Sequence, residues 1–183
     1  MTFTRRSTVV AGLALAAGTP AARAQLSTSH LAERGRAALD RLYAAEPNTQ
    51  FYARRAKGVL IFPSIIKGGL IWGAETGNGV LFLGGRVASY YNTSAASFGL
   101  QIGGQEFSLA MFFMNDRGLG YLHRSGGFAL GTEPNVVVVT AGAAAVANST
   151  TLTQDIYVFP FGQKGLMAGI DIHGSKITPI SGG

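Results

Sequence analysis

The sequence contains no cysteine, which excludes disulfide bonds, thiolate metal sites and attachment of a lipid to a cysteine. Charge is scarce as well, because Asp, Glu, Lys and Arg supply 13% of the residues against about 25% in an average domain. Glycine, by contrast, occurs 26 times in 183 residues, roughly twice the usual ~7%. Together with eleven Phe and six Tyr, this composition predicts one domain built on β-sheet with tight bends.

The first 24 residues are predicted to be an export signal. Arg5 and Arg6 form a basic start, residues 8–18 form an apolar run too short to span a bilayer, and residues 22–24 (ARA) have the small-x-small form that signal peptidase accepts. The arginine pair resembles a twin-arginine signal, but Thr8 stands where an aromatic residue is commoner, so the ordinary secretory route stays open. An N-terminal helix of the mature fold is the alternative interpretation.

Removal of this signal changes the charge of the protein. Cleavage before Gln25 takes away three arginines and no acid, so 12 basic and 9 acidic residues leave a net charge of +3 instead of +6. Such mild basicity argues against a nucleic-acid binder. We therefore expect residues 25–183 to form one periplasmic domain without a nucleic-acid partner, and no later segment is apolar and long enough to cross a membrane.

Two helices are predicted at the start of this domain. Residues 27–46 place apolar side chains on one side, with Ser29 available as a cap and a proline just beyond the last turn. Residues 48–57 predict a second, shorter helix that Asn48 or Thr49 would cap.

From Val59 the apolar pattern changes to short β-type runs separated by glycines. The runs read VLIF, LIWGAE, VLFLGG, RVASYY, SFGLQIGG and EFSLAMFFM, followed later by DIYVFPF, GLMAGIDIHG and SKITPI. Several are apolar on both faces, so the sheet needs a cover on each side or closure into a barrel with an outer layer. The predicted fold is α+β and β-rich: an antiparallel, glycine-rich sheet forming a closed or nearly closed barrel, with the N-terminal helices packed on it.

One segment of the sheet recurs about 97 residues later. FPSIIKGGLIWGAE, from residue 62, matches FPFGQKGLMAGID, from residue 159, with one residue deleted. Six positions align, namely Phe62, Pro63, Lys67, Gly68, Gly73 and Glu75 with Phe159, Pro160, Lys164, Gly165, Gly169 and Asp171. We expect two related hairpins that close the barrel, with chance similarity as the alternative. Glu75 and Asp171 would then be neighbours that do acid–base work or accept hydrogen bonds at a bend.

The Gly- and Lys-containing stretch at residues 62–79 does not match a nucleotide loop. A P-loop requires Gly-x-x-x-x-Gly-Lys-Ser/Thr before a helix, whereas Lys67 precedes its glycines and β-type residues follow. A dinucleotide fingerprint requires a third glycine where Phe82 stands. The three histidines lie far apart without ligand spacing, so no metal or cofactor is expected: His30, His123 and His173.

Ser64 and Lys67 have the Ser-x-x-Lys spacing of the serine enzymes that react with penicillin. YYN at residues 90–92 and RSG at residues 124–126 loosely match other motifs of those enzymes. That chemistry requires the serine at the start of a helix, and the proline before it and the glycine pair after it disfavour one. A serine-dependent acyl-transfer enzyme therefore stays only as a remote alternative.

Three stretches carry a resemblance to a known family: AKGVLIFPSIIKGGLIWGAETGNGVLFLGG, YYNTSAASFGLQIGGQEFSLAMFFM and GLMAGIDIHGSKI. In order and spacing they resemble the SYLF domain family, in its bacterial exported branch, from about residue 56 to residue 177. The resemblance implies a β-rich domain with flanking helices and no catalytic activity. Eukaryotic relatives bind phosphoinositide membranes through a basic amphipathic segment, and some bind actin filaments.

The basic segment of the family maps onto residues 51–57 of this sequence. By resemblance, Arg54, Arg55 and Lys57, with Lys67 beside them, would engage lipid phosphates while Phe51 and Tyr52 enter the interface. Actin and phosphoinositides are not expected in a periplasm, so anionic phospholipid is the expected partner. The alternatives are a solvated basic face with Phe51 on the core, and a structural or protein-interaction module of the envelope without lipid binding.

Overall fold

A computed structural model describes residues 20–69, 72–98, 103–124, 127–130, 135–139, 152–165 and 174–180. Its helices are α1 (Pro20–Ala45), α2 (Thr49–Ala53) and α3 (Asp116–Tyr121). Its strands are β1 (Gly58–Gly69), β2 (Trp72–Leu83), β3 (Arg86–Phe98), β4 (Gly103–Phe113), β5 (Phe128–Ala129), β6 (Val136–Val138), β7 (Ile156–Gly165) and β8 (Lys176–Pro179).

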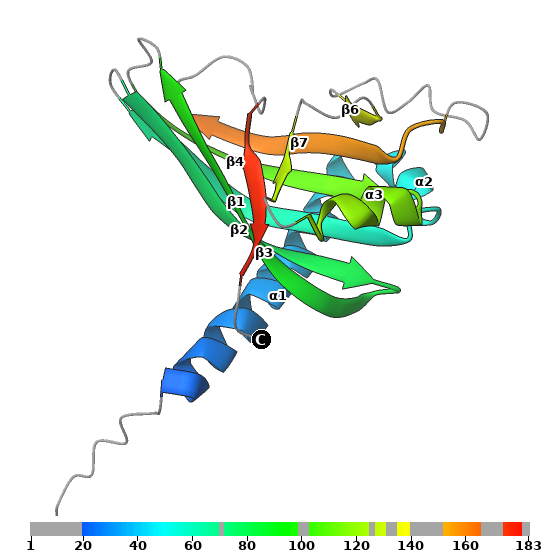
Figure 1. Ribbon diagram of the computed structural model, residues 1–183, viewed down its shortest axis with the longest axis horizontal. Coiled ribbons are helices and arrows are strands. Elements are labelled where there is room, and N and C mark those ends of the chain that lie inside the picture. The colour runs from blue at the N-terminus through cyan, green and yellow to red at the C-terminus, as the bar shows by residue number, and fades with distance from the viewer. Residues whose placement is uncertain are drawn as a thin grey trace, which may run out of the picture.

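The described strands form one sheet in the order β5-β8-β3-β2-β1-β4-β7-β6. All neighbours are antiparallel except β6 and β7, which are parallel. The sheet curls into a half-barrel, with α1 behind it and α3 and β8 in front in the view of Figure 1. The predicted α+β, β-rich fold with packed N-terminal helices is thus confirmed, but the barrel does not close completely.

Each face of the sheet has its own apolar cluster. On the inner face, Leu60 and Phe62 of β1 pack with Phe128 of β5, Ile177 of β8 and Val158 of β7, so residues near both ends of the sheet converge on one core. The other face, called here the helix face, is covered by α1 and α2. This arrangement explains the strands that are apolar on both sides, because both faces are buried.

The central strands bend at the first Phe-Pro pair of the repeat. Pro63 has no N–H to donate, and the register of β1 shifts there against both β2 and β4. The hydroxyl of Ser108 on β4 donates to the Pro63 carbonyl over 2.9 Å. On the other side of β4, Pro160 of β7 lies beside a second register shift. The two repeats therefore flank β4 in the middle of the sheet and do not close a barrel; residues 166–171 of the second repeat lie outside the described residues.

The helix boundaries differ in part from the prediction. α1 begins at Pro20, so Ser29 lies inside the helix and does not cap it. Proline suits a first turn because the N–H it lacks has no partner there. α2 starts after Asn48 as expected, although the Asn48 side chain makes no capping bond. In α3 the Asn115 side chain accepts a hydrogen bond from the Gly118 N–H over 2.9 Å, a conventional N-cap.

α1 lies close against the sheet at Gly35. On helix propensity alone, a glycine at this position makes the helix about 1 kcal/mol less stable than an alanine would. In the structure, however, a Cβ at this position would lie 2.5 Å from Cγ1 of Val80 and 3.1 Å from Cγ2 of Ile61. Both neighbours are fully buried β-branched side chains with little room to move. Gly35 is therefore the residue that permits this helix–sheet distance.

We expect Gly35→Ala to lower the free energy of unfolding by roughly 1 kcal/mol, because overpacking outweighs the gain in helix propensity. Urea unfolding followed by circular dichroism measures the change. Gly120→Ala in α3 is the matched control, since a Cβ there meets no atom within 4 Å. A Gly35→Ala variant as stable as the wild type would show that α1 does not pack this closely.

A buried carboxylate ties α3 to the start of β7. Asp155 has no exposed side-chain area, and it accepts hydrogen bonds from Arg117 Nε at 2.6 Å and Nη2 at 2.7 Å, and from Asn115 Nδ2 at 2.7 Å. Its backbone carbonyl also accepts from the Met114 N–H over 2.9 Å. The Arg117 hydrogen bonds, with a smaller contribution from Asn115, hold the pKa of Asp155 below its usual value although burial acts in the opposite direction.

This lowered pKa predicts a pH dependence. The ionised Asp155 stabilises the fold above the pKa of an unfolded aspartate, about 3.9, and that contribution is lost as the pH falls through the lower folded pKa. Asp155→Asn should therefore lower stability at neutral pH, with a difference from wild type that narrows below about pH 4. Thermal unfolding between pH 2.5 and 7 tests this.

Asp116→Asn is the control for this series, because Asp116 is an exposed carboxylate on the same helix and its ion pair lies at the surface. It should change stability little at any pH. An Asp155→Asn difference that stayed constant down to pH 2.5 would contradict the assignment.

Candidate lipid-binding surface

The predicted basic segment lies on one end of the molecule, where α2 meets β1. A groove of about 500 Å³ runs there between α1, α2, the first residues of β1 and the β2–β3 turn. Its basic side chains are Arg36 of α1 and Arg54 and Lys57 beyond α2. We call this the basic groove. Arg36 was not among the residues predicted from sequence, because its place on α1 gave no sign that it lies across from Arg54.

Most charges around the basic groove already have a local partner. Lys57 Nζ pairs with the carboxylate of Asp116 at 2.5 Å. The Arg55 guanidinium lies 3.7 Å from the centre of the Phe51 ring and donates to the Phe51 carbonyl over 3.3 Å. Arg54, by contrast, has no side-chain hydrogen bond or ion pair within the described part of the chain. It is the cation of this segment best placed to meet an external anion.

The two aromatic residues of the segment have different positions. Tyr52 is 3% exposed, and its ring lies 5.0 Å from that of Tyr157 and 4.9 Å from that of Phe159. Burial raises the pKa of its hydroxyl. Tyr52 therefore anchors α2 to the sheet and does not enter an interface, contrary to its predicted role. Phe51 is half-buried at the edge of the same cluster, beneath the Arg55 guanidinium.

Lys67 does not lie beside the basic segment. It follows Gly58 by nine residues of β1, which places it about 30 Å along the strand. Its side chain is 8% exposed and belongs to the inner face, in register with Glu75 and Gln105. Lys67 is therefore removed from the candidate surface.

Glu75, which lies in register with Lys67, is one of the two carboxylates that the repeats align. Glu75 is buried and accepts a hydrogen bond from the Ser175 hydroxyl over 3.1 Å. Asp171, its partner in the repeat alignment, lies outside the described residues. This hydrogen bond gives the Glu75 carboxylate a structural role.

Ser64 and Lys67 are not arranged as a nucleophile and its base. Ser64 lines the grooves beside α1 and donates to Glu106 Oε1 over 2.7 Å. Lys67 shares the inner face with Ile65, because side chains alternate along the strand. The two groups thus lie on opposite faces of the sheet, which removes the basis for a Ser-x-x-Lys enzyme.

The turn between β2 and β3 presents apolar side chains next to the basic groove. Gly84 and Gly85 adopt φ angles of 55° and 78°, a left-handed geometry that favours glycine, and both line the groove. Leu83 on one side of the turn is 39% exposed and Val87 on the other side is 37% exposed. The sequence signal was the Gly-Gly pair between two strands, but only the fold places this turn beside α2.

Within the residues that the structure describes, no cluster of three or more His, Cys, Asp or Glu side chains is arranged to hold a metal, and no helix has the length and apolarity to span a bilayer. His30 and His123 are exposed, and His173 lies outside the described ranges.

The fold is a half-barrel with N-terminal helices packed on one face of the sheet. Comparison with family models matches residues 94–181 to the Ysc84 family, described as Las17-binding protein actin regulator. This is the SYLF domain family, so the resemblance is confirmed over residues 94–181, whereas the bacterial exported branch stays a prediction. The family is of lipid-binding or actin-regulator type, which fits a non-enzymatic module. A search of curated proteins found no match.

The matched region begins inside β3. Residues 51–57, and with them the whole predicted basic segment, precede it. The role of that segment in this chain therefore depends on its own geometry, and the family match does not reach it.

Proposed function

We propose that this protein is a non-enzymatic module that binds anionic phospholipid at the surface of the cell envelope. After export and removal of residues 1–24, it would act in the periplasm, attached peripherally to a membrane. The observation that carries the proposal is the basic groove with the exposed apolar turn beside it. A surface of this composition attracts phosphate headgroups and inserts a small apolar area between them.

The expected affinity is modest. Each Lys or Arg near an anionic membrane contributes about 1 kcal/mol, and Arg36, Arg54 and Arg55 are the cations not engaged with a carboxylate. Insertion of Leu83 and Val87 adds apolar burial, worth at most about 1.5–3 kcal/mol for each complete side chain. Binding should therefore be reversible and sensitive to salt.

A second candidate function, a protein-interaction module, has its own supporting observation. β6 is the last strand in the described sheet order, and its Val137 and Val138 are each 39% exposed. An unpaired strand edge with apolar side chains can accept an added strand from a partner. The name of the matched family, a Las17-binding protein, is compatible with a protein partner, although actin is not expected in the proposed compartment.

Co-sedimentation with vesicles tests the lipid proposal. The purified protein should bind phosphatidylglycerol or cardiolipin vesicles at low salt, release at high salt, and ignore phosphatidylcholine vesicles. The double variant Arg54→Gln/Arg55→Gln should weaken binding by about tenfold or more, since it removes two of the three available charges. Lys176→Gln, which removes an exposed charge on β8 outside the basic groove, should bind like the wild type.

Equal binding by the double variant and the Lys176→Gln control would show that lipid binds at a surface other than the basic groove. No binding to anionic vesicles at low salt would reject the lipid function and leave the protein-interaction module as the better proposal.

Export is tested by the mass of the protein recovered from the periplasm. We expect its N-terminus at Gln25, with loss of export when Arg5 and Arg6 are both replaced by lysine if the twin-arginine route is used. A full-length protein retained in the cytoplasm would contradict the proposed location.

A further inference from the structure

A second set of cations lies along the other flank of α1. Arg34 and Arg41, two helical turns apart, line a groove of about 420 Å³ together with Lys164 of β7. The floor of this groove is formed at Pro63 and Ser108, where the central strands bend. The bend in the sheet therefore places three exposed positive charges around one depression.

These three cations have no partner within the described part of the chain. Among the described residues, no hydrogen bond or ion pair involves the side chain of Arg34, Arg41 or Lys164. Glu106 is the acidic residue of the groove's described lining, and its Oε1 accepts the hydroxyl hydrogen of Ser64 over 2.7 Å. Two arginine forks and a lysine around a depression of this size suit a phosphate group, which arginine binds through paired N–H donors.

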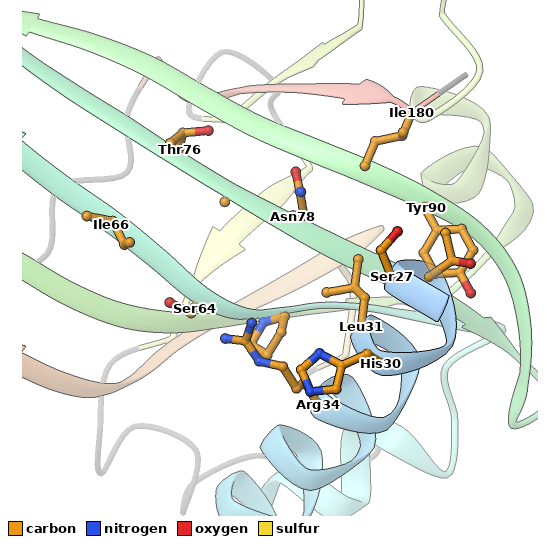
Figure 2. A pocket seen from close by; sticks show the side chains of 13 residues that line it. Ser27, His30, Leu31, Arg34, Ser64, Ile66, Thr76, Asn78, Tyr90 and Ile180 are labelled. Atoms are coloured by element: carbon orange, nitrogen blue, oxygen red, sulfur yellow. The ribbon is translucent and has the colours of Figure 1, made fainter. Parts of the chain in front are cut away.

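A second depression lies next to this one. It measures about 440 Å³ and lies between the first half of α1 and the helix face of β1, β2 and β3, as Figure 2 shows. Arg34 and Pro63 line both depressions, so the two lie next to each other. Apolar side chains contribute much of its lining, and among them Ile66 is 61% exposed and Ile180 is 39% exposed. Such exposure of isoleucine in a groove indicates an apolar surface that a ligand would cover.

We propose that the two depressions form one site for a single-chain amphiphile with a phosphate headgroup, such as a lysophospholipid. Arg34, Arg41 and Lys164 hold the phosphate, and the chain lies along Ile66 and Ile180. Glu106 accepts a hydrogen bond from a headgroup hydroxyl, which favours a glycerol-type headgroup over one without hydroxyls. This site is separate from the basic groove, so it does not depend on the vesicle-binding surface.

Isothermal titration of the purified protein tests this site with monomers of lauroyl-lysophosphatidylglycerol below the concentration at which they form micelles. Two comparators separate the parts of the ligand: glycerol 3-phosphate has the headgroup without the chain, and lauroyl-lysophosphatidylcholine has the chain without net charge. We expect the lysophosphatidylglycerol to bind at least about tenfold more tightly than either. Glycerol 3-phosphate binding as tightly would reduce the site to a phosphate site and overturn the amphiphile assignment.

The variants identify the residues. Arg34→Gln and Arg41→Gln should each weaken lysophosphatidylglycerol binding about tenfold or more, and Ile66→Ser should weaken it without changing the binding of glycerol 3-phosphate. Arg86→Gln, an exposed charge outside both depressions, is the matched control. Unchanged binding in Arg34→Gln and Arg41→Gln, with unaltered circular dichroism, would overturn the proposal.

A cross-comparison of variants tests whether the amphiphile site acts independently of the basic groove. Arg54→Gln/Arg55→Gln should keep the affinity for the monomer, and Arg34→Gln should keep vesicle binding within about threefold. A variant of the basic groove that lost monomer binding would show that the two surfaces act as one, and would overturn the separate site.

Discussion

The close contact between α1 and the sheet at Gly35 is the constraint on which the rest of the molecule depends. Without a Cβ at this point, the helix lies directly on Ile61 and Val80 and covers the helix face of a sheet that is apolar on both sides. The same contact sets the position of Arg36 beside α2 and of Arg34 and Arg41 above the bend at Pro63. Both candidate binding surfaces thus lie along one helix and share its distance from the sheet.

The two surfaces differ in how their charges are held. Around the basic groove, Lys57 is paired with Asp116 and Arg55 is stacked on Phe51, so much of the positive charge is already compensated within the fold. Arg34 and Arg41 of α1 have no such partners in the described region. A count of basic residues would rank residues 54–57 first. The geometry shows that the charge available to a ligand is distributed differently, since an internal partner reduces what a cation offers to an external anion.

Much of the fold was predictable because it depends on local chemistry. The glycine-separated apolar runs correctly indicated a β-rich chain, and the apolar spacing of residues 27–46 correctly indicated an N-terminal helix. The degree of barrel closure was not predictable, because it depends on which strands meet at the ends of the sheet; the sheet forms a half-barrel, and β4 lies between the two repeats. The site residues divided in the same way: Arg54 and Arg55 lie at the surface, whereas Tyr52 and Lys67 are buried by packing that no local pattern reveals.

The sequence by itself determined the β-rich class, the SYLF resemblance and the absence of cysteine chemistry, because composition and short-range spacing are sufficient for these. Only the tertiary structure decided which face of the sheet each side chain occupies. Ser64 and Lys67 show this most clearly, because the register of β1 shifts between Phe62 and Ile65, so spacing alone does not fix their faces. The fold places Ser64 in a groove beside α1 and Lys67 on the inner face. It also decided which cations converge, because Arg41 and Lys164 are distant in the chain and meet only where α1 crosses the bent sheet.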